Sequence, residues 1–482
     1  MTIGNIKLAT RTRPSQFAMV LLALLPIPPP TIHGTGREMD RFKALKIEVH
    51  HHVLDKILNP LREAYDNGIR IRCADMKYRK CFPILAAWPA DHMEYVKLFN
   101  VTQKLCPVCT IPHDSIGRRD DQIHSSRNYH NYEAAYNTLV DTENATPGER
   151  TAAKSQLIKE GIKLSFNVFW SLPGVQVEAL HVPDLLHGMY LGLLDYLMRW
   201  LDGFLADCER SSVFDNIWRT LPRYPGFAPP TKSFREVSSW QGKELRQFGR
   251  VVLSALAAAL STPNDHSSMI GKVKRETVTQ ALSCVRNLTD FQLMAEYPSH
   301  TETTIGYMKG YLKGYHDGKA AFKKYKATKR DKRDMTDAVR SLQQDHERAA
   351  PTPGNETNAA KAKRLEENHK ELAAKKNELA GSFNFIKMHL PTHYEDHVRR
   401  FGSIPAFSTE AGESAHRRQV KDGYRTSNHQ PGTFYKQIIS YYTRVSAMGI
   451  RQLNVKQLVR EGYYKEETAD VLDLMTDSGK IH

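Results

Sequence analysis

The sequence is short of cysteine and of long apolar runs, and both shortages exclude classes of protein. Only six cysteines occur in 482 residues, and four of them are scattered, which argues against a secreted disulfide scaffold. The apolar stretch Phe17 to Ile27 is too short to span a bilayer and is ended by prolines, so we expect no membrane partner. We interpret residues 16–25 as a buried strand.

The composition is otherwise that of an ordinary globular chain with an excess of positive charge. Hydrophobic residues make up 40% and charged residues 25% of the sequence. The length is enough for roughly two to four domains. The net charge of +15 favours a polyanionic partner, nucleic acid first, with solvated surface charge as the alternative.

Residues 1–118 have the pattern of α/β structure. An acidic cap and apolar residues on one side predict a helix over residues 40–61. Residues 68–73 and 80–87 predict a hairpin across the polar turn Asp75-Met-Lys77. The second of these strands would end at Asp91, where a carboxylate can face a site, although a cap or turn is the more common role of such a residue.

Residues 119–380 are mostly helical in pattern, with apolar helices predicted at 181–204, 247–260 and 280–295. A basic loop, 323–333, and a charged helix, 358–379, follow in the same region. Seven basic side chains form the loop: Lys323, Lys324, Lys326, Lys329, Arg330, Lys332 and Arg333. We interpret them as a DNA-contacting arm, with a solvated loop as the alternative.

Residues 381–462 return to mixed apolar patterning, with helices predicted from about residue 409 and over 437–458, and residues 463–482 form a tail.

Two short pairs have the spacing of zinc ligands. Cys106 and Cys109 form a CxxC, and His389 and His393 lie one helical turn apart, with Pro391 between them suited to a first turn or a bend. A CxxC alone also fits a redox pair, but the βαβ context of a thioredoxin motif is not readable here. Together the pairs predict a Cys2His2 site that joins distant parts of the chain.

Carboxylates flank these pairs, and each also has a plain structural interpretation. Glu410 and Glu413 share one helical face, and Ser408 or Thr409 before them looks like an N-cap. Asp184 and His187, at the start of an apolar helix, are typical of a helix-end carboxylate and a packed histidine. A role for this last pair in lining a site is the minority interpretation.

Several phrases resemble the Plavaka-type transposases of basidiomycete fungi, relatives of the CACTA elements. They occur in the family's order from about residue 2 to 450. They are residues 73–91, Leu105-Cys-Pro-Val-Cys109, Pro183-Asp-Leu-Leu-His187, Ser239-Trp-Gln-Gly-Lys-Glu244, Glu296-Tyr-Pro-Ser-His-Thr301, and Ser408-Thr-Glu-Ala-Gly-Glu413 through His416 to Tyr424-Arg-Thr-Ser-Asn428.

The resemblance implies a DDE-type nuclease and strand transferase of the nucleus. Its fold would be an α/β RNase H-like core interrupted by a large, mostly α-helical insertion domain. Carboxylates of such enzymes hold catalytic Mg²⁺ ions that activate water and then a 3′-OH. The family's second aspartate falls on Asp91 and its last glutamate on Glu410, with Glu413 as second choice. The four Cys and His residues would hold a structural Zn²⁺, and transposon ends and target DNA would be the partners, with a homo-oligomer as a further candidate.

The sequence departs from the family's pattern at its start. The family's first catalytic aspartate lies on a strand before Thr2-Ile-Gly-Asn-Ile6, so we expect an N-terminally truncated, inactive transposase-derived protein. One alternative is a non-catalytic, zinc-containing DNA-binding or scaffold protein of the same ancestry. Another is an unrelated metal-dependent hydrolase that uses Asp91, Asp184, His187 and Glu410.

Overall fold

The computed structural model describes residues 1–25 except 3 and 5, 36–73, 75–118, 124–225, 227, 233, 236–237, 240–261, 267–325 and 383–463. The chain forms two compact units. The smaller unit comprises Met1–Ala86, Ser171–Gly174 and Ser408–His482, and the larger comprises Ala87–Trp170 and Val175–Phe407. Among the described helices, none combines the length and apolarity needed to cross a bilayer.

The smaller unit consists of helices from both ends of the chain and one hairpin. Its elements are α1 (Leu8–Arg11), η1 (Pro14–Gln16), α2 (Gly36–Asn67), β1 (Ile69–Arg72), β2 (Tyr78–Cys81), α16 (Thr409–His416), η7 (Arg417–Lys421), α17 (Asp422–Arg425) and α18 (Phe434–Arg460). Three predicted helices are confirmed by α2, α16 and α18.

The predicted hairpin exists, but its second strand is shorter than expected. β1 and β2 pair antiparallel with Ile69 opposite Cys81, and Met76 takes a positive φ of 62° in the turn. The prediction of a strand as far as Ala87 is wrong, because pairing ends at Cys81, which lies opposite Ile69, the first residue of β1. Asp91 therefore does not follow a strand.

The prediction of a buried strand over residues 16–25 is also wrong. After η1 the segment has no regular structure, and Val20 and Leu22 are each 50% exposed. The segment is held by two side chains and by Met1: Leu21 N donates to Tyr442 Oη at 3.1 Å, Met19 O accepts from Gln419 Nε2 at 2.7 Å, and Val20 exchanges two backbone hydrogen bonds with Met1. An apolar run does not reveal whether a pairing strand exists beside it.

The larger unit is a helical body. Its elements are α3 (His92–Leu98), η2 (His113–Ser115), α4 (Tyr129–Val140), α5 (Pro147–Lys159), α6 (Val177–Leu180), η3 (a π-helix, Leu185–Leu194), α7 (Asp195–Asp207), α8 (Ser211–Arg219), α9 (Gly242–Leu260), β3 (Met269–Ile270), β4 (Val273–Lys274), α10 (Arg275–Ala295), α11 (Glu302–Gly318), η4 (Lys319–Tyr325), α14 (Ile386–His389), η5 (Leu390–His393), α15 (Tyr394–Phe401) and η6 (Pro405–Phe407).

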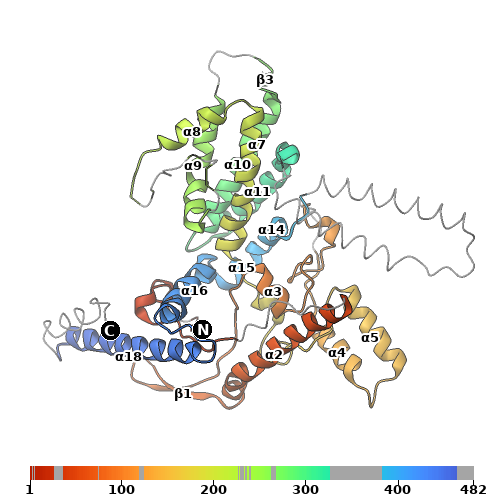
Figure 1. The fold of residues 1–482 in the computed structure, drawn as a ribbon, viewed down its shortest axis with the longest axis vertical. Helices are drawn as coiled ribbons and strands as arrows, with labels where there is room; N and C mark the ends of the chain where they lie inside the picture. The colour runs from red at the N-terminus through yellow and green to blue at the C-terminus, as the bar shows by residue number, and fades with distance from the viewer. Residues whose placement is uncertain are drawn as a thin grey trace, which may run out of the picture. The chain divides into compact units, whose positions relative to one another are not determined.

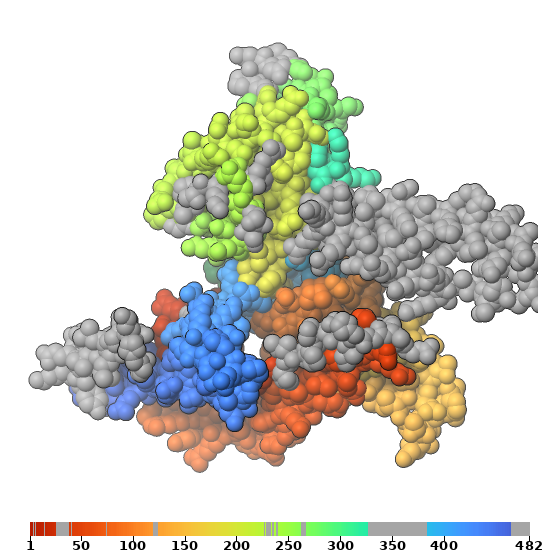
Figure 2. Space-filling model, viewed as in Figure 1, coloured from red at the N-terminus to blue at the C-terminus, as the bar shows by residue number. Residues whose placement is uncertain are grey.

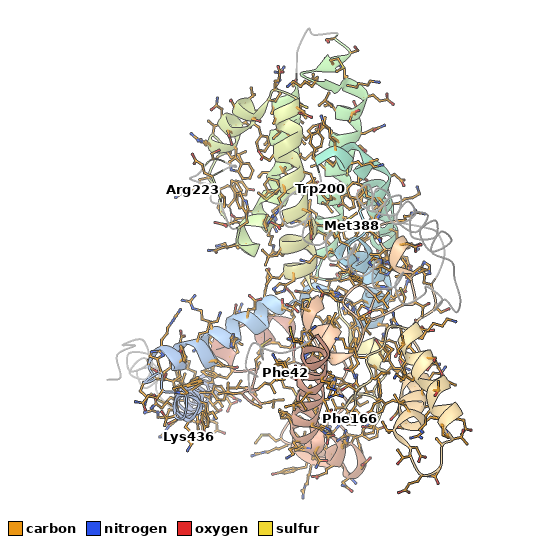
Figure 3. All side chains as sticks on the ribbon, turned by 45° about the vertical axis from the view of Figure 1, so that its right-hand side comes forward. Phe42, Phe166, Trp200, Arg223, Met388 and Lys436 are labelled. Atoms are coloured by element: carbon orange, nitrogen blue, oxygen red, sulfur yellow. The ribbon has the colours of Figure 1, made fainter. Side chains whose placement is uncertain are left out.

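Its core lies among α7, α8, α9, α10 and α11, which stand together in Figure 1. Trp200 of α7, labelled in Figure 3, is fully buried against Phe322, Phe383 and Phe385. Phe383 and Phe385 lead into α14, so the ligand-bearing segment is packed onto the helical body. The apolar helices predicted around residues 181–295 are confirmed by η3, α7, α9 and α10.

A second part of the larger unit is the hairpin of α4 and α5, drawn in light orange in Figure 2. Asn128 caps α4, and Thr146 with Glu149 forms a capping box at α5. The described strands of the whole chain form only two-stranded hairpins, β1–β2 and β3–β4. The RNase H-like core stays a prediction.

Candidate metal centre

The Cys106–Cys109 loop is fixed by residues that follow it in the larger unit. Buried Arg127 donates from Nε to Cys106 O at 2.6 Å and from its backbone N to Val108 O at 2.9 Å. Tyr129 Oη donates to Pro107 O at 2.7 Å. Val108 N donates to Cys106 Sγ at 3.4 Å, a contact that stabilises a thiolate. These bonds fix the conformation of the loop that carries both sulfur atoms.

The histidines come from a break between two short helices. His389 ends α14, and His393 ends the 3₁₀ turn η5, in which Pro391 occupies the first turn. This is the placement that proline tolerates, because a backbone N–H is not needed there. The prediction of a first turn or bend at Pro391 is confirmed.

The structure brings the four side chains together, as the spacing predicted. Cys109 Sγ lies 3.2 Å from His389 Nε2, and Cys106 Sγ lies 3.3 Å from His393 Nε2. The two Nε2 atoms are 3.1 Å apart, and all four ligand atoms lie within 4.8 Å of one another. Tetrahedral zinc separates its S and N ligands by about 3.3–3.8 Å. The cluster can therefore bind a metal such as zinc.

The surroundings of the cluster also suit a metal. Ile111, Ile116, Val108, Ile386 and Leu390 form an apolar shell around it. Burial raises the pKa of the Cys106 thiol, whereas the hydrogen bond from Cys106, and then those from both histidines, lower the pKa of Cys109. Burial lowers the pKa of His389, which favours the neutral imidazole that coordinates metal.

The histidine segment is held on both sides. Asn384 accepts from Gly117 N at 2.8 Å and donates to His113 O at 2.5 Å, which ties the segment to the loop after the cysteines. Toward the helical body, Tyr394 stacks on Phe291 with ring centroids 5.5 Å apart, and Lys387 Nζ donates to Leu191 O at 3.1 Å.

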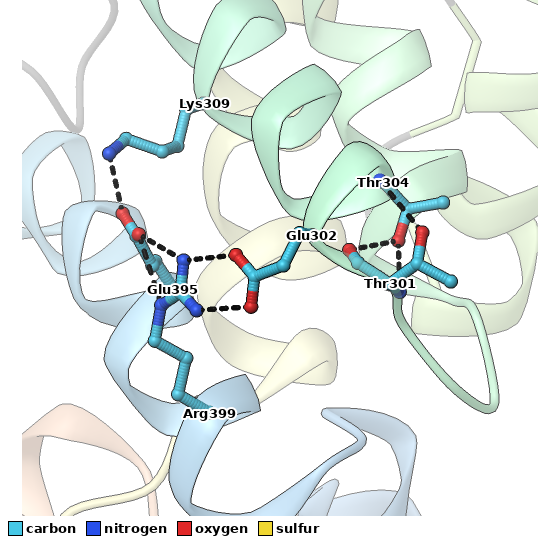
Figure 4. Close-up of polar contacts among 6 residues, drawn as sticks. All are labelled: Thr301, Glu302, Thr304, Lys309, Glu395 and Arg399. Carbon is cyan, nitrogen blue, oxygen red and sulfur yellow. Dashed lines mark hydrogen bonds and ion pairs between the residues drawn. The ribbon is translucent and has the colours of Figure 1, made fainter.

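A cluster of ion pairs also attaches α15 to α11 of the helical body. Arg399 forms a bidentate pair with Glu302, at 2.6 and 2.8 Å, and Glu395 pairs with Lys309 at 2.9 Å (Figure 4). Arg399 also contacts Glu395 at 3.1 Å, so one cluster links α15 to the start of α11. These charges are largely exposed, and their role is to orient α15 rather than to supply much stability.

Asp184 and His187 form a compact pair at the start of η3. Asp184 accepts from Leu186 N and His187 N at 3.1 and 3.0 Å, and its Oδ2 lies 2.6 Å from His187 Nδ1. The pair thus serves as a helix cap. A role in lining a site stays a prediction.

The carboxylates carried over from the transposases also occupy helix starts. Asp91 caps α3 by accepting from Glu94 N at 2.7 Å, and Ser408 caps α16 so that Glu410 lies in its first turn. Glu413 is exposed one turn later. Asp91 belongs to the larger unit and Glu410 to the smaller, and their predicted proximity stays a prediction.

The predicted basic loop is only partly within the described residues. Lys323 and Lys324 lie in η4, where Lys324 pairs with Asp207. The other five lie outside the described residues, as does the charged helix 358–379: Lys326, Lys329, Arg330, Lys332 and Arg333.

Three residues that hold the ligand-bearing segments in place were not predicted from the sequence: Arg127, Tyr129 and Asn384. Each acts through its contact with a backbone atom, and such contacts leave no spacing pattern in the sequence. A basic residue about twenty positions after a CxxC was the only available signal for Arg127, and it is weak.

The chain was compared with protein families and with curated proteins. No curated protein matches the sequence. A model of a protein family, described as Plavaka transposase, matches residues 1–201, which include Asp91, both cysteines and Asp184 but not the histidines or Glu410. This match supports a Plavaka-type transposase as the relative of the chain.

Proposed function

We propose that this chain is a DNA-binding protein of transposase ancestry whose two units are built around a DDE-type nuclease plan, and that Cys106, Cys109, His389 and His393 hold one structural zinc ion. The single observation that carries the proposal is the Cys2His2 cluster, whose cysteines lie inside the segment that matches the transposase family while its histidines lie far outside it.

The zinc would act as a cross-link. Its cysteines precede the helical body and its histidines follow it, so the bound ion fixes the entry and exit of that body against each other. The ion supplies coordination bonds and no reactive position, because four protein ligands close a structural site. Arg127 and Tyr129 hold the backbone of the cysteine loop, and Asn384 ties the histidine segment to the loop after it, so these contacts orient the ligands as outer contacts do at other zinc sites.

The catalytic part of the proposal concerns carboxylates. We propose that Asp91 of the larger unit and Glu410 of the smaller, or Glu413 in its place, correspond to Mg²⁺-binding carboxylates of DDE-type transposases, and that the protein binds transposon ends and target DNA in the nucleus. Carboxylate oxygens are the ligands that Mg²⁺ prefers.

Two measurements on the purified chain test the proposal. Metal analysis should find one zinc per chain in the wild type and much less in His389→Ala, while His130→Ala, an exposed histidine of α4, should retain it. Binding of a duplex oligonucleotide should weaken linearly in log–log form as salt rises. Zinc-free folded protein, or a flat salt response, would contradict it.

The alternative is a non-catalytic zinc protein that binds DNA or serves as a scaffold. It is favoured by the burial of the Cys2His2 cluster in an apolar shell, which serves stability and needs neither Asp91 nor Glu410. Plasmid cleavage that requires Mg²⁺ and is lost in Asp91→Asn would exclude it.

A further inference from the structure

The last helix of the smaller unit carries charge of one sign only. α18 has 27 residues, and its five charged side chains are all basic: Lys436, Arg444, Arg451, Lys456 and Arg460. Helices on protein surfaces usually mix both signs, which gives support through pairs three or four residues apart. α18 contains no Asp or Glu with which its basic side chains could form such pairs inside the helix.

One face of α18 packs on its own unit. Ile438 and Gly449 are its buried residues. A Cβ at Gly449 would lie 2.0 Å from the ring of Phe17, and a Cβ at Gly423 of α17 would lie 3.3 Å from Ile438 Cα. Tyr442, between them on the same face, accepts from Leu21 N.

The opposite face presents the basic side chains to solvent. At 100° per residue, Lys436, Arg444 and Arg451 fall within one sector, on the side away from Ile438 and Gly449, and all three are exposed. Serine, alanine and asparagine fill the same sector at Ser440, Ala447 and Asn454. The three charges extend over about 22 Å of helix, at 1.5 Å per residue.

The elements that precede α18 add further positive charge. Arg417, Lys421 and Arg425 of η7 and α17 are exposed, and Arg425 pairs with Asp422. A cavity beside α18 is lined by Arg11, Arg13 and Arg418, and no carboxylate is among its lining residues. The positive charge thus belongs to this part of the smaller unit and not to one side chain.

We propose that the solvent face of α18, with Lys436, Arg444 and Arg451, is a docking surface for the phosphate backbone of duplex DNA. Lys436 is labelled in Figure 3, and α18 lies in the blue surface of Figure 2. One DNA strand carries a phosphate about every 3.4 Å along the axis, so a 22 Å strip passes roughly six of them. The proposal rests on the proposed DNA-binding function and assigns it a surface that lies outside the basic loop at 323–333.

A membrane surface is the competing polyanion, and the residue pattern disfavours it. A helix that lies on a bilayer turns an apolar face into the lipid and keeps its charges at the rim. Here the sector that holds the charges also contains Ser440, Ala447 and Asn454, and the exposed apolar side chains lie outside it, with Tyr435, Ile439 and Ile450 on one side and Met448 on the other. Ser440 and Asn454, which share the sector with the basic residues, can also donate hydrogen bonds to phosphate oxygens.

The test compares two charge-matched variants of the full chain. The surface variant is Lys436→Gln/Arg444→Gln/Arg451→Gln, and the control is Lys154→Gln/Lys159→Gln/Lys243→Gln, which removes three exposed lysines of the larger unit. Affinity for a 30-base-pair duplex is measured by fluorescence anisotropy over a range of salt. We expect the surface variant to bind about 10- to 100-fold more weakly at 0.15 M salt, with a salt slope smaller by about 0.9 for each lost contact.

Each outcome decides something. A wild type that binds with a steep salt slope, together with a surface variant that behaves like the control, would overturn the surface and leave the proposed function standing. A wild type that does not bind DNA would overturn both. Binding of the wild type to phosphatidylserine vesicles, lost in the surface variant while DNA binding persists, would assign the face to lipid and overturn the proposal. Thermal melting of both variants should match the wild type, since all six side chains are exposed.

Discussion

The long helices of the two units differ in what they bury. α10 has 21 residues and buries nine of them, whereas α18 has 27 and buries two. The sequence of α10 is explained by what it packs against, since Val278, Leu288 and Phe291 all lie in the core. The sequence of α18 is not explained by packing, and its uniform positive charge points to a partner. Burial thus distinguishes the residues of α10, which stabilise the core, from the exposed basic residues of α18, for which we propose a binding role.

The largest expected effect concerns the candidate metal centre, which lies in the larger unit, the densely packed side of this comparison. Cys109→Ser should lower the melting temperature by about 10 °C or more, because losing a ligand forfeits a cross-link that contributes several kcal/mol. Cys81→Ser, at a free cysteine of β2, should change it little. Calorimetry of zinc-loaded and chelated protein makes the measurement. Equal melting of the two wild-type forms would show that the cluster is not a structural site.

The next effect contrasts the two kinds of helix directly. Trp200→Ala, in the core of the larger unit, should destabilise the protein by about 3–5 kcal/mol. Met448→Ala, on α18, where the side chain is 41% exposed, should stay within about 0.5 kcal/mol of wild type. Denaturant unfolding measures both. A large loss of stability in Met448→Ala would contradict the exposure of this side chain in the isolated protein.

A smaller effect concerns pH and is confined to the larger unit. Burial lowers the pKa of His397 to about 4, and also lowers that of His181. Both histidines stay neutral in the folded chain while the unfolded chain takes up protons below about pH 6.5. Stability is therefore complete above that pH and falls as pH drops toward 4, by roughly 3 kcal/mol at pH 4 for His397.

Unfolding by urea at a series of pH values tests this. His397→Phe, which can join the ring cluster of Phe401 and Phe407, should reduce the slope of the profile between pH 6.5 and 4, and the slope that remains is the contribution of His181. His130→Gln, at an exposed position of α4, should leave the profile unchanged. A slope in His397→Phe equal to that of the wild type would assign the pH dependence to groups other than His397.

The smallest effect concerns the ion pair between Arg399 and Glu302. Both side chains are exposed, at 42% and 78%, so screening by water and salt offsets the bidentate geometry. A double-mutant cycle with Arg399→Gln and Glu302→Gln should give a coupling at the limit of detection that disappears in 1 M salt. A strong, salt-resistant coupling would show that α15 is held by this pair rather than by Tyr394 and Val398.

The parts of the fold that could be predicted are those with a local signal. The helices α2, α9 and α10 carry apolar periodicity, and the cap at Ser408 is a local motif. The metal site could be assembled because zinc restricts both ligand type and spacing. The structure of residues 16–25 could not be predicted, because an apolar segment forms a strand only where another strand lies beside it. The composition of the segment does not show whether such a strand exists. The roles of Arg127 and Asn384 could not be predicted either, because both side chains contact backbone atoms of segments that are distant in the sequence.

The positions of the four ligands in the sequence also mean that the cysteines are synthesised well before the histidines. Cys109 and His389 are separated by 280 positions in the chain. At a synthesis rate of about 5–20 residues per second, the cysteines leave the ribosome roughly 15–60 seconds before the histidines. For that interval the two thiols lack the imidazoles of His389 and His393, so they can be oxidised or can bind a different metal. Ribosome-bound chains stopped before residue 389 should therefore react with thiol reagents at both cysteines, whereas the finished protein should not.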